Sequence, residues 1–139
     1  MSEMKLRTRD QIPVEDTWAL EDLYASDEAW EAELASLSED QAHLVSYAGK
    51  LGSSADDLYG YLTQMEHTDA KAGLLGNYCM RKADQDTGNP IYQAMSGKFM
   101  STVVALGAAC SFETPELMAI PQEVLEEFYA RKPELERYR

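Results

Sequence analysis

The stretch from Phe99 to Phe112 carries no charged residue, although 27% of the residues in the chain are charged. It is too short, and too rich in Ser, Thr and Gly, for a membrane span, which needs about 20 apolar residues. A helix that is apolar nearly all round is typical of a position surrounded by other helices. Apolar side chains also recur along one stripe, at Phe99, Val103, Leu106 and Cys110. The sequence therefore predicts an all-α protein, an antiparallel bundle of about four to five helices with a buried central helix at about residues 90–112.

The charge balance is strongly acidic. The 139 residues include 25 acidic and 12 basic side chains, for a formal net charge of −13. Such a surface repels phosphate backbones and anionic lipid, so we expect neither nucleic-acid binding nor membrane binding. The first residues lack the apolar segment of a secretory signal, and two cysteines do not make a disulfide framework in a chain of this length. We therefore expect a cytoplasmic protein.

The chain divides into an arm and one helical domain. Residues 1–13 are expected to form a flexible N-terminal arm, which Pro13 closes. Residues 14–139 are expected to form the helical domain. Its first run, Trp18-Ala-Leu-Glu-Asp-Leu-Tyr24, is too apolar for a solvent-exposed loop. A short helical turn packed on the bundle is therefore predicted there.

A first long helix is predicted to start at Ser26 or Asp27, which are both favourable N-cap residues, with Asp27 and Glu28 near the positive helix end. The side chains of one face then follow at helical spacing. They are Trp30, Leu34, Leu37, Gln41, Leu44 and Ala48, of which only the glutamine is polar. Gly49 and Gly52 are expected to end this helix.

A second helical segment is predicted over residues 54–86, which no proline interrupts. Ser54-Ala-Asp-Asp57 resembles a capping box at its start. One long helix and two consecutive helices both fit, and we favour one helix with a kink, since Gly73 and Gly76 weaken the pattern. The run Asp86-Thr-Gly-Asn-Pro90 then combines a helix stop with a new start. The next helix is therefore predicted to run antiparallel to this one.

After Phe112 a turn is predicted over residues 113–118, and short helices are predicted beyond it. Pro121 opens an amphipathic segment that carries Val124, Leu125 and Phe128. A further helix begins at Lys132-Pro133, but a helix needs about 12–15 residues to be even marginal on its own. The stop at Arg139 therefore suggests a piece of a longer chain, and a frayed natural terminus is the alternative.

Metal-binding patterns are weak in this sequence. It holds two histidines, His43 and His67, and neither belongs to a His-Glu-x-x-His motif. Glu66, His67 and Asp69 are close in sequence but lie on different faces of a helix. A polar helix surface is therefore favoured over a metal site.

Signatures of nucleophilic or phosphate chemistry are also lacking. Cys79 and Cys110 lie on apolar faces, where buried free thiols are favoured over a disulfide or a reactive site. The chain has no Gly-x-Ser-x-Gly elbow and no Gly-rich phosphate loop. The sequence therefore predicts no catalytic, cofactor-binding or metal-ligating residue.

Four segments, in order, resemble the start of oligoendopeptidase F, a zinc oligopeptidase of the thimet type. They are Trp18–Tyr24, Leu51–Leu62, Tyr78–Gln93 and Ser111–Leu117, and the likeness covers about residues 10–139. The resemblance implies a mostly helical protein with one catalytic zinc. That zinc would be held by a His-Glu-x-x-His helix and a downstream Glu in a later domain. None of those ligands matches a position in this sequence.

The resemblance identifies residues 14–139 as a non-catalytic N-terminal lobe, with the catalytic domain absent from the chain. Such a lobe would help to wall the channel over the active site, so that only short, unfolded peptides enter. Its partners would be the catalytic domain of the same polypeptide and short peptide substrates, and a homo-oligomer of the isolated lobe is a further option. The alternative is a free-standing helical module that binds a partner helix or peptide. An independent metal or thiol enzyme is a weaker option, and we expect no peptidase activity from the chain alone.

Overall fold

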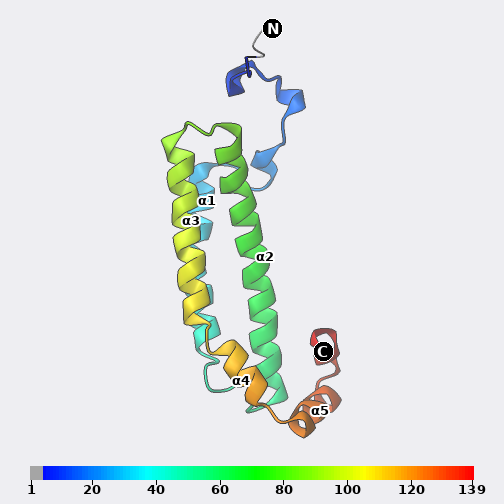
Figure 1. Ribbon diagram of the computed structural model, residues 1–139. Helices are drawn as coiled ribbons and strands as arrows, with labels where there is room; N and C mark the ends of the chain where they lie inside the picture. The colour runs from blue at the N-terminus through cyan, green and yellow to red at the C-terminus, as the bar shows by residue number, and fades with distance from the viewer. Residues whose placement is uncertain (1–4) are drawn as a thin grey trace.

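The computed structural model describes residues 5–139, and Figure 1 shows three long helices lying side by side. These are α1 (Asp27–Val45), α2 (Ala55–Gln85) and α3 (Pro90–Ala109). Two shorter helices follow at one end, α4 (Glu113–Ala119) and α5 (Gln122–Arg131), so the turn predicted over residues 113–118 is a helix instead. Segments of 3₁₀ helix lie at Arg9–Gln11, Val14–Asp16, Leu20–Asp22 and Pro133–Tyr138. Residues 5–139 contain no strand, and the predicted all-α helical bundle is confirmed.

α1 begins where the sequence predicts, because Ser26 caps it. The Ser26 hydroxyl oxygen accepts a hydrogen bond of 3.1 Å from the backbone N–H of Ala29. The helix ends at Val45, before the expected stop at Gly49 and Gly52, which lie in the following loop. Gly49 has φ 80°, a left-handed conformation that glycine adopts at little cost because it lacks a Cβ.

α2 is one uninterrupted helix of 31 residues, so residues 54–86 do not form two helices. Ser54 caps it, accepting a hydrogen bond of 3.0 Å from the backbone N–H of Asp57. α2 contacts α1, α3 and α5, together with the 3₁₀ segments Leu20–Asp22 and Pro133–Tyr138. The helix at the centre of the bundle is therefore α2.

α3 is not the buried central helix that its composition predicts. Asn89 caps it and Pro90 opens it as expected, but it ends at Ala109 rather than near residue 112. Its buried side chains are Met95, Phe99 and Leu106, with Cys110 just beyond the helix. On the opposite side Val104 is 66% exposed. The reason is that small uncharged side chains occur both in the protein interior and at its surface. Composition therefore does not show how many other helices pack against a helix.

By length and composition alone, the stretch Pro90–Ala119 could also cross a membrane. Only 22% of its most apolar window is buried in the structure. α3 packs along α2 through Met95 and Phe99.

The core consists of two clusters, one along the three long helices and one at the end with α4 and α5. The first is centred on Trp30, Leu75 and Phe99, and the second on Leu51, Tyr61 and Leu135. The predicted turn at residues 18–24 is present as the 3₁₀ segment Leu20–Asp22. Leu20 is buried in the first cluster, with Leu23 and Tyr24 packed against it, whereas Trp18 is 70% exposed. The turn thus packs on the bundle through Leu20 and not through Trp18.

The 3₁₀ turn Arg9–Gln11 and the C-terminal segment Pro133–Tyr138 lie at opposite ends of the bundle (Figure 1). Residues 1–4 of the expected flexible arm lie outside the described residues, and the rest of the arm includes the 3₁₀ turn Arg9–Gln11. The helix predicted from Lys132-Pro133 is a 3₁₀ segment, Pro133–Tyr138. Leu135 anchors that segment, since its side chain is fully buried in the second cluster.

Candidate interaction groove between α1 and α3

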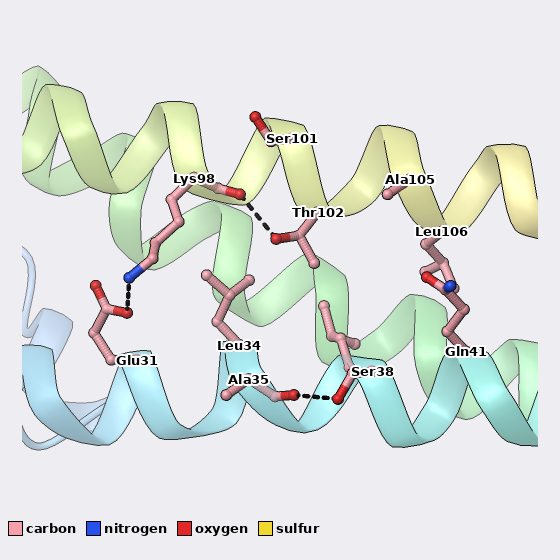
Figure 2. Close-up of a pocket in the computed structure, with 11 residues that line it drawn as sticks. Glu31, Leu34, Ala35, Ser38, Gln41, Lys98, Ser101, Thr102, Ala105 and Leu106 are labelled. Carbon is pink, nitrogen blue, oxygen red and sulfur yellow. Dashed lines mark hydrogen bonds and ion pairs between the residues drawn. The ribbon is translucent and has the colours of Figure 1, made fainter.

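A groove of about 420 Å³ runs between α1 and α3 (Figure 2). It is open to solvent along the outside of the bundle and is the candidate site of this molecule. Residues from both helices line it: Glu31, Leu34, Ala35, Leu37, Ser38 and Gln41 from α1, and Lys98, Ser101, Thr102, Ala105 and Leu106 from α3.

Short side chains on the two facing helices create this groove. Ala35 and Ser38 of α1 and Ala105 of α3 leave the space between the helices unfilled, and the Ser101 side chain points away from α1 (Figure 2). The apolar surface comes from Leu34, Leu37 and Leu106, which belong to the two core clusters. The groove therefore opens onto the apolar interior of the bundle.

An ion pair bridges one end of the groove. Lys98 Nζ on α3 lies 2.5 Å from Glu31 Oε2 on α1. Both side chains are largely exposed, and an exposed pair of this kind contributes at most about 1 kcal/mol to stability. The pair links α1 to α3 across the groove. The other residues that line the groove carry no charge.

Two of the hydroxyl groups along the groove, those of Ser38 and Thr102, are bonded to their own helices. Thr102 Oγ1 donates to the carbonyl of Lys98 at 2.9 Å, and Ser38 Oγ donates to the carbonyl of Ala35 at 2.9 Å (Figure 2). Bonds from Ser and Thr to the preceding helical turn satisfy the hydroxyl proton locally. Ser38 and Thr102 therefore have no hydroxyl proton left for a ligand, and the other polar groups of the lining are the Gln41 amide, the Ser101 hydroxyl and the Lys98–Glu31 pair.

The groove continues onto the exposed side of α3, which we call the α3 outer face. It consists of Ala94, Gly97, Met100, Ser101, Val104 and Ala108, all of them exposed. Lys98 is the only charged residue between Pro90 and Phe112. The chain has a net charge of −13, so an uncharged exposed face on one long helix is unusual. Exposed faces of this kind are typical of surfaces that contact another protein segment.

The histidines and acidic residues weighed as metal ligands do not converge. His43 and His67 are both exposed, and His43 stacks on Tyr47 with ring centroids 5.6 Å apart. The Glu66 carboxylate pairs with Arg137 and accepts a hydrogen bond of 2.6 Å from Tyr138. Within residues 5–139 no group of three His, Cys, Asp or Glu side chains could hold a metal ion.

The two cysteines are buried free thiols, as the sequence predicts. Cys79 belongs to the first core cluster and Cys110 to the second, so they do not meet. Burial raises the pKa of both thiols, and the nearby Glu113 carboxylate raises that of Cys110 further. A raised pKa keeps a thiol protonated and poorly nucleophilic.

A polar contact inside the second cluster has no sequence signal. Tyr61 Oη donates a hydrogen bond of 2.6 Å to Glu113 Oε2, although 52 residues separate them. Burial, then this hydrogen bond, raises the pKa of Tyr61. Burial and the Glu113 charge also raise the pKa of Asp69. The contact ties the start of α4 to α2, and it lies away from the groove.

Comparison with known proteins relates nearly the whole chain to one group of peptidases. No protein-family model matches it. The chain is 37% identical over 134 residues to the oligopeptidase PepF of Bacillus subtilis, which is 96% of this chain and 20% of that protein. It is 31% identical over 134 residues to the plasmid oligoendopeptidase F of Lactococcus lactis subsp. cremoris, covering 95% of this chain and 22% of that protein.

A solved structure is similar as well. The crystal structure of oligoendopeptidase-F from Enterococcus faecium matches with a TM-score of 0.72 and 25% sequence identity, over 81% of this chain and 22% of that one. The chain thus spans about a fifth of the length of the relatives it matches. In sequence and in fold, this chain belongs to the oligoendopeptidase F family, of which it represents one helical part.

Proposed function

We propose that this chain is the non-catalytic N-terminal helical lobe of a zinc-dependent oligoendopeptidase. The observation that carries the proposal is the combination of 37% identity along 96% of the chain with coverage of only 20% of the relative. A whole enzyme would match most of its relative, whereas a lobe matches one part of it. The four ordered motifs in the sequence support the same position in the parent protein.

In this proposal the chemistry belongs to the rest of the parent polypeptide. The zinc of the family would be held there, by ligands that have no counterpart among residues 5–139. Zinc would activate water for attack on the peptide bond. The lobe contributes shape: its long, rigid helices wall the approach to the active site, so that short peptides enter and folded proteins do not.

The partners follow from that role. The lobe packs against the catalytic domain of the same polypeptide, and short peptides pass between them. Self-association of the isolated lobe is the weaker option, because its net charge of −13 opposes it. Cytoplasmic residence also stays a prediction.

The test uses a chimera of the Bacillus subtilis oligopeptidase PepF in which this chain replaces the matched 134 residues. Its rates on a short fluorogenic peptide and on unfolded casein are compared with those of the intact relative and of the relative with the matched stretch deleted. We expect the chimera to cleave the short peptide and to spare casein, and the deleted form to lose activity or size selection. A deleted form with unchanged rate and selectivity would contradict the channel-wall role.

The uncovered α3 outer face also favours a second candidate, a free-standing module that binds a partner helix. Reading the gene past the codon for Arg139 separates the two. A downstream reading frame with a His-Glu-x-x-His motif supports the lobe, and an immediate stop codon supports the module. Peptidase assays on the chain alone are expected to show no activity.

A further inference from the structure

We propose that the groove between α1 and α3, with the α3 outer face, receives an apolar helix from the part of the parent polypeptide that lies outside this chain. The inference rests on the proposed function and names the face through which the lobe meets the rest of the protein. The sequence alone does not identify that face, since it presents α3 as buried on all sides.

The shape of the bundle favours a helix as the occupant. α1, α2 and α3 each contact the other two, so the groove between α1 and α3 lies on the side away from α2. A fourth helix laid in this groove would complete a four-helix bundle, the arrangement in which each helix buries one apolar stripe between neighbours. Gly97, Ser101 and Ala105 would let its backbone come close to α3.

The chemistry of the face favours an occupant that is mainly apolar. Met100 is 48% exposed and Val104 66%, and the polar groups of Ser38 and Thr102 are bonded to their own helices. Burying apolar surface contributes about 25 cal/mol per Å² of area removed from water. A charged or strongly polar segment would lose its hydration here and would find few polar partners in return, namely Gln41, Ser101 and the Lys98–Glu31 pair. The Lys98–Glu31 pair marks the one end at which a polar flank of the occupant would be tolerated.

Two observations favour the parent polypeptide over a second copy or a membrane. Roughly four-fifths of the length of the matched relatives has no counterpart in this chain, which leaves ample polypeptide to cover the face. A second copy would bring another net charge of −13 close to the first. Anionic lipid meets the same repulsion, and Lys98 is the only basic residue of α3.

Thiol labelling of the chimera described above tests the face directly. Val104→Cys places a thiol on the α3 outer face, and Leu74→Cys places a matched thiol on an exposed position of α2 outside the groove. Each variant is treated with a maleimide, as the isolated chain at low micromolar concentration and as the chimera. Mass spectrometry of peptides reads labelling at each position, and the unchanged chain gives the background from Cys79 and Cys110.

We expect labelling at position 104 to be at least about tenfold slower in the chimera than in the isolated chain, because reactivity follows exposure. Labelling at position 74 should be similar in both. Equal rates at position 104, or equal protection at both positions, would overturn the inference. Peptidase activity of the chimera is measured separately. If the chimera is active and the thiol at position 104 still reacts freely, the α3 outer face is not the contact surface, and the proposed function is unaffected.

Two further measurements keep the proposal falsifiable. If the chimera does not fold, the residue aligned with Val104 is replaced by cysteine in the intact Bacillus subtilis relative, where a freely reactive thiol would overturn the inference. For the isolated chain, labelling at position 104 is repeated at rising protein concentration and with vesicles of phosphatidylcholine and phosphatidylglycerol. Protection that grows with concentration would assign the face to a second copy, and protection by vesicles would assign it to lipid. Either result would overturn the choice of occupant.

Discussion

The indole Nε1 of Trp30 donates a hydrogen bond of 2.8 Å to the backbone carbonyl of Leu75, and both side chains are fully buried. The contact joins α1 to α2 across 45 residues of sequence. A buried tryptophan contributes a large apolar area and needs a partner for its N–H group, and Leu75 supplies that partner. The pair therefore fixes how the first two helices pack.

Trp30→Phe is expected to lower the free energy of unfolding by about 2 kcal/mol, since it removes this hydrogen bond and leaves a cavity beside α2. Trp18→Phe is the matched control, because Trp18 is largely exposed, and it should change stability by less than about 0.5 kcal/mol. Urea unfolding followed by circular dichroism measures both. Equal unfolding midpoints for the two variants would contradict the role of Trp30.

Gly76→Ala is expected to destabilise the seam between α2 and α3. A Cβ added to Gly76 would lie 2.8 Å from Cζ of the buried Phe99 ring, which has little room to move. Overpacking of this kind costs about 1–3 kcal/mol. Gly73→Ala is the control on the same helix, with nothing within 4 Å of the added atom, and it should stabilise by up to about 1 kcal/mol. Thermal unfolding should move in opposite directions for the two variants, and a shift in the same direction would reject this account.

Glu116→Gln is expected to loosen the loop between α1 and α2. The Glu116 carboxylate of α4 accepts hydrogen bonds from the backbone N–H groups of Gly49 and Leu51. Bonds to an ionised acceptor are stronger than bonds to a neutral one, so the change should cost about 1 kcal/mol and speed amide exchange at those two residues. Glu123→Gln, at an exposed position of α5, is the control. Unchanged exchange at Gly49 would show that the carboxylate does not hold the loop.

Stability should fall as the pH rises above 10. Burial, followed by the hydrogen bond to Glu113, raises the pKa of Tyr61 above its ordinary value of 10.0. The folded state then keeps a phenolic proton that the unfolded state loses, so it binds more protons, and its stability declines with pH in that range. Tyr61→Phe should be less stable than the unchanged chain at pH 8 but should decline less steeply between about pH 9 and 11. Urea midpoints across this range test the slope, and parallel curves for the two proteins would refute the assignment.

Local patterns predicted the starts of the three long helices well. Ser26, Ser54 and Asn89 were identifiable as caps because capping involves only residues two or three positions away. Pro90 marks the start of α3 for the same reason, and the run of residues 54–86 without proline allowed one helix. The family resemblance rested on four short motifs that occur in the same order along the chain, and it identified the oligoendopeptidase F family.

The groove and the exposure of α3 could not be predicted in this way. Whether an apolar helix is surrounded depends on how many other helices reach it, and residues far apart in the sequence decide that. Here α2 takes the centre because Trp30 from one side and Phe99 from the other pack against it. The sequence by itself determined which long segments are helical and to which family they belong, because both depend on residues that lie close together in the sequence. Only the tertiary structure decided which face of α3 stays uncovered, because that depends on contacts between distant segments competing for the same apolar surface.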